Sequence, residues 1–212
     1  MGNVHINLRK SVLANYHHGD LRAALLDAAR RMLEAAPAAE LSLRALATAV
    51  GVSPNAPYRH FPTKEDLLAA LAGQGFHELT NSFHPHELQS GPARLEGDLA
   101  AYLAFAQVNP GLYRLMFGRN LDPLSCNPQL GEHARSCFQA LEATVAAVMG
   151  LEASDPAVAA GAASVWSLSH GAALLEIDRA TAFLPPPARP NAVAMAQMVV
   201  AGLGRAKAGH AV

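Results

Sequence analysis

Apolar and polar positions along this 212-residue chain alternate with the period of an α-helix, and no run of alternating β-branched residues predicts a strand. The first helix is expected from about Gly19 to Ala36, where apolar side chains share one face and Pro37 ends the pattern. Later helices are expected at about residues 93–108, 110–118, 132–149, 155–181 and 190–206. Together with three shorter patterns described next, they predict an all-α protein of about nine helices.

Three further helices are expected between residues 42 and 83, each with a terminal signal. Ser42 is a favourable N-cap for a short helix, and Gly51 suits its left-handed C-cap. Ser53 followed by Pro54 fits the first two positions of a second short helix, which Pro62 ends. Thr63 and Asp66 form a variant capping box for a helix that runs to about Phe83. Two short helices joined at a glycine indicate a helix-turn-helix, and the segment His84–Pro92 is the best candidate domain boundary.

Composition and charge narrow the class of protein. Apolar residues make up 51% of the chain and charged residues 16%, which favours a folded protein over a disordered one. Residues 1–64 hold eight basic and four acidic side chains, whereas the rest of the chain holds eight basic and thirteen acidic ones. A basic N-terminal part on an acidic body indicates a polyanionic partner at one end only.

The two cysteines, Cys126 and Cys137, do not form a CxxC pair, which is typical of a reducing cytoplasm. The N-terminus has no apolar core of a signal peptide, so we expect a cytoplasmic protein. Residues 156–175 carry no charge and are long enough to span a bilayer. Because they are mostly Ala, Gly and Ser, a buried helix of a soluble protein is expected instead.

The predicted helix-turn-helix leaves a polar set of residues facing outward. Asn55, Ala56, Arg59 and His60 remain after Phe61 and the other apolar positions are assigned to a small core. Lys64 stands at the start of a helix, where the macrodipole favours an anion, so a bound phosphate would account for it. An ordinary solvated lysine at that position, and an ordinary three-helix packing unit, are the alternatives.

The segments GDLRAALLDAARRMLEAA and LSLRALATAVGVSPNAPYRHFPTKEDLLAAL resemble the DNA-binding domain of the TetR (tetracycline-repressor-like) family. The resemblance implies a helix-turn-helix domain at residues 15–75 and an effector-binding and dimerisation domain at residues 76–212. Pro57 departs from the family pattern, because many relatives have an apolar residue with a free N–H there, and the recognition helix therefore loses an early hydrogen bond. The residues that the resemblance assigns to DNA contacts are Ser42, Arg44, Ser53, Asn55, Ala56, Tyr58, Arg59, His60 and Lys64.

A second resemblance covers AFAQVNPGLYRLMFG and VWSLSHGAALLEID, which are similar to the ligand-binding region of a TetR subgroup with a Trp-His-Gly signature. Here the signature is Trp166, His170 and Gly171. The resemblance implies an effector cavity, although each of its candidate residues also suits a plain hydrophobic core. These candidates are Tyr102, Phe105, Tyr113, Phe117, Trp166 and His170.

The expected function is therefore a ligand-responsive transcriptional repressor that binds a palindromic operator in double-stranded DNA as a homodimer. The helices at 155–181 and 190–206 are the expected dimerisation surface. The partners are operator DNA, an unknown small-molecule effector and a second copy of the chain, with no membrane, metal or cofactor, and no enzymatic activity is expected. The alternatives are a helical interaction module that has lost DNA binding, a metal-binding helical enzyme built on His77, His84 and His86, and a redox switch at the two cysteines.

Overall fold

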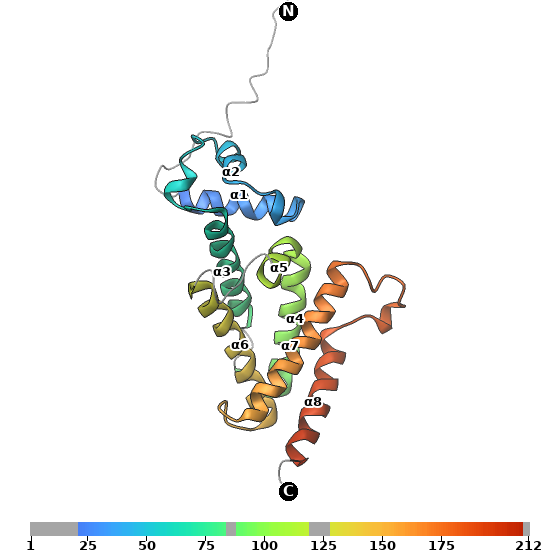
Figure 1. The fold of residues 1–212 in the computed structure, drawn as a ribbon. Helices are drawn as coiled ribbons and strands as arrows, with labels where there is room; N and C mark the ends of the chain where they lie inside the picture. Colours follow the sequence, from blue (N-terminus) through green and yellow to red (C-terminus); the bar gives the residue numbers. More distant parts are fainter. Residues whose placement is uncertain (1–20, 84–87, 119–127, 210–212) are drawn as a thin grey trace, which may run out of the picture.

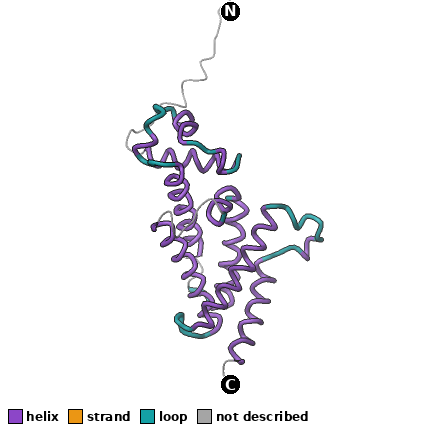
Figure 2. The backbone as a smooth tube through the Cα atoms, viewed as in Figure 1, coloured by secondary structure: helices purple, strands orange, loops and turns teal. Residues whose placement is uncertain are grey.

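The computed structural model describes residues 21–83, 88–118 and 128–209. Several predictions lie partly or wholly outside them: the start of the first helix at Gly19, the outer ends of the two domains at residues 15 and 212, part of the boundary segment His84–Pro92, the pair His84 and His86, and Cys126. Within the described residues the chain is all-helical, with eight α-helices and no strand (Figure 2). The predicted fold class is confirmed.

An N-terminal head and a C-terminal helical body make up the molecule (Figure 1). The head contains α1 (Leu21–Ala35), α2 (Leu43–Val50) and two 3₁₀ turns, η1 (Ala38–Glu40) and η2 (Pro57–Arg59). The body contains α4 (Gly91–Val108), α5 (Pro110–Phe117), α6 (Pro128–Met149), α7 (Pro156–Ile177), a 3₁₀ turn η4 (Pro186–Ala188) and α8 (Ala192–Gly209). The helix α3 (Lys64–Phe83) begins in the head and continues into the body, where it packs along α6.

The helix positions agree with the hydrophobic pattern, apart from one element. The five body helices begin and end within about four residues of their predicted positions. The helix expected at Pro54 is absent, and the chain there forms a turn followed by η2. The prediction of a ninth helix was therefore wrong.

The core is continuous from head to body. In the head, Leu25 of α1, Leu46 of α2 and Phe61 are almost fully buried, and the Arg22 guanidinium lies 5.2 Å from the centre of the Phe61 ring. In the body, α4 is packed between α3, α6, α7 and α8. The two parts meet along α3 and where α1 contacts α5, so a shift in the body has two routes to the head.

The helix α7 is long and apolar enough to cross a membrane by length and composition alone. In this structure it packs against α4 and α6, and Val158, Ala162 and Val165 on its inner face are buried. The small side chains that the sequence places here permit this close helix contact, as Gly161 lies against Val145 of α6.

Candidate functional site

The turn of the helix-turn-helix is built as the sequence predicts. Ser42 caps α2 by accepting a hydrogen bond at its Oγ from the Ala45 amide at 3.1 Å. Gly51 ends α2 with φ of +77°, a conformation that costs glycine nothing and other residues much more. The following chain is then secured because the Val52 amide donates to the Ala47 carbonyl at 2.9 Å.

The segment after this turn corrects the prediction of an α-helical recognition element. Pro57 stands four residues after Ser53 and lacks the amide hydrogen that would donate to the Ser53 carbonyl in a helix capped by Ser53. The backbone instead forms hydrogen bonds between residues three positions apart. The Ala56 amide donates to the Ser53 carbonyl at 3.0 Å, and the Arg59 amide donates to the Ala56 carbonyl at 3.3 Å. The segment remains compact, because the Phe61 amide reaches the Pro57 carbonyl at 2.9 Å.

The residues predicted to contact DNA lie at the surface of this head. Pro57 and Phe61 are buried and anchor the segment, which leaves the side chains between them pointing away from the core. The Lys64 ammonium donates to the Ala39 carbonyl at 2.8 Å, and the capping box beside it forms, with the Thr63 amide donating to Asp66 at 3.0 Å. Exposed members of the predicted set are Ser42, Arg44, Ser53, Asn55, Tyr58, Arg59 and His60, while Ala56 and Lys64 are half-buried.

The body encloses a cavity of about 670 Å³ among α3, α4, α5, α6 and α7. Its walls are mainly apolar and aromatic, and its volume is in the range of small-molecule sites. Four of the six residues predicted for effector binding line it, namely Tyr102, Phe117, Trp166 and His170. The other two, Phe105 and Tyr113, are buried in the surrounding core and do not form part of its wall.

Tyr113 acts instead as the middle member of a hydrogen-bonded relay behind the wall. Its hydroxyl lies 2.8 Å from the Tyr102 hydroxyl and 2.7 Å from Nδ1 of His170. Burial raises the pKa of both tyrosines and lowers the pKa of His170 below its ordinary value of 6.5. All three groups are therefore uncharged at neutral pH.

Two charged residues also line the cavity. Asp98 is 4% exposed, and it accepts a hydrogen bond from Thr144 at 2.6 Å and lies 3.7 Å from Nε of Arg94. Arg135 lies on α6 and is exposed to solvent. Cys137 is buried at the same wall, and burial raises the pKa of its thiol to about 11, which disfavours the reactive thiolate that a redox switch needs.

Several lining residues were missed by the sequence interpretation. Phe76 and Phe83 come from α3, which was treated only as the end of the helix-turn-helix, and Asp98 was not singled out. The spacing of Phe76 and Phe83, two turns apart on one helix face, was the available signal.

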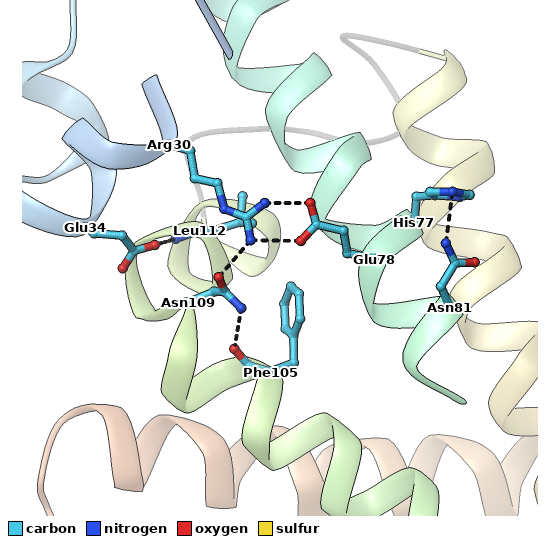
Figure 3. A network of polar contacts seen from close by, with 8 residues as sticks. All are labelled: Arg30, Glu34, His77, Glu78, Asn81, Phe105, Asn109 and Leu112. Atoms are coloured by element: carbon cyan, nitrogen blue, oxygen red, sulfur yellow. Dashed lines mark hydrogen bonds and ion pairs between the residues drawn. The ribbon is translucent and has the colours of Figure 1, made fainter. Parts of the chain in front are cut away.

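A polar network joins the head to α3 and α5, two of the helices that contribute residues to the cavity wall (Figure 3). Arg30 of α1 forms a bidentate ion pair with Glu78 of α3, at 2.5 and 2.8 Å, and donates to Asn109 at 2.8 Å. Glu34, one turn further along α1, accepts hydrogen bonds from the amides of Gly111 and Leu112 at 2.9 and 3.2 Å.

The side chain of Asn109, at the N-cap position of α5, makes no cap hydrogen bond. Glu34 of α1 fills this role from another helix, because it accepts from the free amides of the first turn of α5. The two helices approach so closely that a Cβ on Gly111 would overlap the Leu33 carbonyl oxygen. The opposite end of α5 supplies Met116 and Phe117 to the cavity. One short helix therefore contacts the head at its first turn and the cavity at its last.

The neighbours Ser169 and His170 on α7 make their hydrogen bonds to other residues, as does His77, one of the three histidines of the predicted metal site. The Ser169 hydroxyl donates to the carbonyls of Val165 and Trp166 on its own helix, while the relay nitrogen of His170 faces Tyr113. His77 Nε2 contacts the Asn81 amide at 3.0 Å (Figure 3). Across the part of the chain that the structure describes, no group of three or more His, Cys, Asp or Glu side chains is placed to hold a metal ion.

Comparison with known families decides the class of the protein. Residues 25–71 match the family of bacterial regulatory proteins of tetR type, and residues 98–202 match the tetracyclin repressor-like C-terminal domain. The chain belongs to the TetR family. It is thus a DNA-binding regulator by class, and the family match covers both the head and the cavity-bearing body.

Named relatives of this TetR-family chain include nucleoid occlusion factors SlmA. The factor from Marinomonas sp. strain MWYL1 is 38% identical over 101 residues, which are 46% of this chain and 50% of that protein. The factor from Vibrio vulnificus strain YJ016 is 32% identical over 133 residues, which are 61% of this chain and 67% of that protein. The chain thus spans about half to two thirds of the length of these relatives.

Solved structures extend the likeness over nearly the whole chain. A protein of unknown function from Rhodococcus sp. RHA1 is 28% identical, with a TM-score of 0.73, and the match covers 91% of this chain and 98% of that one. A tetR-family transcriptional regulator from Streptomyces coelicolor is 22% identical, with a TM-score of 0.67 and coverage of 89% and 82%. The second likeness shows the fold alone.

Proposed function

We propose that this TetR-family chain is a repressor whose homodimer binds a palindromic operator and is released when a small molecule enters the cavity. The observation that carries the proposal is the position of α5, which lies between the head and the cavity. In this proposal residues 15–75 bind DNA and residues 76–212 bind the effector and the second copy, although α3 continues across residue 75 without a break. The chain would act in the bacterial cytoplasm and without catalysis.

The exposed side chains of the head support DNA binding. Arg44 and Arg59 are free to reach guanine edges or phosphates, and Ser42, Tyr58 and His60 add hydrogen-bonding groups around them. The short turn in place of a recognition helix presents fewer residues to a groove than a full helix does. We therefore expect the start of α2, through Ser42 and Arg44, to carry a large share of the contacts.

Exposed apolar side chains support dimerisation through α7 and α8. Among the described residues, six of the nine exposed large apolar side chains fall between Trp166 and Met198. Leu168 and Leu175 lie on α7 and Val193 lies on α8, and small residues lie between these exposed side chains. Covering this surface with a second copy would remove it from water and yield a four-helix interface.

The position of α5 supports a response to ligand. A molecule that displaces Phe117 or Met116 would shift α5, and the Glu34 cap with the contact at Gly111 would pass that shift to α1. The Arg30 ion pair with Glu78 fixes α1 on α3 at the same level. A ligand that binds better when α5 is shifted would then favour a head spacing that does not match the operator.

Fluorescence anisotropy with a labelled palindrome from upstream of the gene tests the proposal. We expect specific binding by a dimer, with the logarithm of the affinity falling linearly with the logarithm of the salt concentration. The variant R44A should bind roughly tenfold or more weakly, whereas R135A, which removes the same charge from the body, should bind as wild type. Absence of specific binding would refute operator recognition.

Two further readouts address the remaining parts of the proposal. Sedimentation should give a dimer, and a monomer at the concentration used for DNA binding would contradict the paired heads. An operator complex that resists every ligand found to bind the cavity would contradict the release step. That outcome would favour a ligand-independent DNA-binding role, such as the nucleoid occlusion in the names of the relatives.

A further inference from the structure

The cavity wall has a strongly aromatic section. Phe117, Phe138 and Trp166 surround one end, with ring centres 6.2 Å apart for Phe117 and Trp166 and 6.3 Å apart for Phe138 and Trp166. Rings at such spacing and tilt offer edges and faces to a further aromatic ring. His170 lies at the same place, 5.0 Å from the centre of Phe117 and 5.8 Å from that of Trp166.

Counting protons in the relay shows what the wall offers beside these rings. Tyr102, Tyr113 and neutral His170 carry one exchangeable proton each, and the two short hydrogen bonds between them use two of the three. One proton is left over. Tyr113 is 0% exposed and has its hydroxyl engaged on both sides, so the spare proton belongs to an end of the relay.

Both ends of the relay line the cavity. If the spare proton is on His170 Nε2, the imidazole donates and the Tyr102 oxygen accepts. If it is on Tyr102, the hydroxyl donates and Nε2 of His170 accepts. In either arrangement the two ends together offer one donor and one acceptor, and the Tyr102 hydroxyl lies 3.5 Å from Nδ1 of the same imidazole, next to aromatic rings. A hydroxyl group satisfies both, because it accepts one hydrogen bond and donates another.

The two charged residues of the cavity wall, Asp98 and Arg135, do not indicate a charged ligand. Asp98 already has Thr144 and Arg94 as partners, and Arg135 is exposed to solvent. An ion placed against the relay would lose its hydration in return for contacts with uncharged groups only.

We propose that the effector is an uncharged aromatic compound with a hydroxyl group, a phenol, whose hydroxyl lies between Tyr102 and His170 and whose rings pack on Phe117, Phe138 and Trp166. This inference rests on the proposed role of the cavity as the effector site, and it specifies the chemistry of the ligand.

Binding of four matched probes to the free protein tests the proposal. They are 4-hydroxybiphenyl, biphenyl, biphenyl-4-carboxylate and 4-phenylbenzylammonium, measured by calorimetry and by quenching of Trp166, the only tryptophan of the chain. We expect 4-hydroxybiphenyl to bind about tenfold more tightly than biphenyl and more tightly than either ion. Equal affinity for 4-hydroxybiphenyl and biphenyl, or no saturable binding of any probe, would overturn the proposal. Tightest binding of the ammonium would indicate a cation cage, and tightest binding of the carboxylate would indicate Arg135 as the anchor; either result also overturns it.

A double variant locates the preference at the relay. In Y102F/H170F the advantage of 4-hydroxybiphenyl over biphenyl should disappear while biphenyl affinity stays within about twofold, which also shows that the cavity is intact. The matched control is S167A, because Ser167 lies on the same helix with its hydroxyl bonded to the Ala163 carbonyl, and it does not line the cavity. S167A should keep the full preference. A preference that survives in Y102F/H170F would contradict the proposed contact.

These measurements use no DNA, so they fail or succeed separately from operator binding. A protein that selects 4-hydroxybiphenyl but does not leave its operator would keep the ligand class and refute the proposed release. A protein that leaves its operator when it binds a ligand of another class would keep the proposed release and refute the phenol as the ligand.

Discussion

The head and the body use their residues in opposite ways. In the head, the candidate contact residues are on the surface, and only a few buried anchors such as Phe61 and Leu46 hold them in place. In the body, the candidate contact residues face inward from five helices and enclose a cavity. The head presents polar side chains on an open surface, as a large partner such as DNA requires, whereas the cavity of the body has room only for a small molecule.

Because of this difference, substitutions in the head can change binding without changing stability, whereas substitutions in the cavity wall are expected to change both. An exposed arginine of the head can be removed without exposing the core, so its loss affects only binding. A residue of the cavity wall packs against its neighbours as well as against the ligand, so most changes there alter both properties. Variants that test this contrast are described below in order of expected effect.

The largest loss of stability is expected from F61A, at the end of the segment that follows the Gly51 turn. Phe61 is 2% exposed and joins the segment to the head core, so its removal should lower the free energy of unfolding by about 3–5 kcal/mol in urea titration. The control is Y58A, three residues earlier and 44% exposed, which should change stability by no more than about 0.5 kcal/mol while weakening operator binding. Equal destabilisation by the two variants would contradict the division between anchors and contacts.

A smaller loss of stability is expected from T144V in the body. Thr144 is fully buried and donates a 2.6 Å hydrogen bond to Asp98, and valine keeps the shape but removes the donor. We expect a loss of about 1–3 kcal/mol in the same urea titration. T48V, which removes an exposed hydroxyl bonded to the Arg44 carbonyl in the head, is the matched control and should have little effect.

The link between the two regions is tested with E34A. Loss of the carboxylate removes the cap on the first turn of α5, so ligand in the cavity should act less strongly on the head. We expect the ligand-induced drop in operator affinity to shrink by about tenfold, measured by anisotropy with and without ligand. E40A removes an exposed acid from the same head and should retain the full response. An unchanged response in E34A would place the coupling elsewhere.

The smallest effect is a dependence of stability on pH that originates at His170. Burial lowers its pKa in the folded protein below 6.5, so the unfolded chain takes up a proton that the folded protein resists. The contribution of His170 to the free energy of unfolding therefore falls as the pH drops from 6.5 toward the folded pKa. The advantage in urea stability of wild type over H170Q should therefore narrow as the pH falls below 6.5. S169A should follow the wild-type pH profile.

The sequence predicted the features that depend on neighbours along the chain. The Ser42 cap, the left-handed Gly51 and the Thr63–Asp66 box all lie where short-range chemistry placed them. The recognition helix was predicted wrongly because the effect of Pro57 on an early hydrogen bond was noted but a helix was still assumed. Without the Pro57 amide hydrogen, the first hydrogen bond of a helix capped by Ser53 cannot form, and a turn followed by η2 takes its place.

The cavity could be predicted only in part, because its walls come from helices far apart in the chain. Tyr113 and Trp166 have similar aromatic character in the sequence, yet one is sealed behind the wall and the other forms it. No pattern within a single helix distinguishes these two positions. The Glu34 cap joins residues 77 and 78 positions apart, so it has no local signal either.

The helix α3 runs without a break from the head to the cavity, so a tilt at one end is transmitted to the other. Its 20 residues form a rod about 30 Å long, with Phe76 and Phe83 at the cavity and the Thr63–Asp66 box at the other end. A tilt of about 4° at the cavity would displace the far end by about 2 Å, which is several times the roughly 0.5 Å range of donor–acceptor distances over which a hydrogen bond forms. Under the proposed release mechanism, small shifts of the side chains around the cavity would therefore be enough to misalign the two heads of a dimer on an operator.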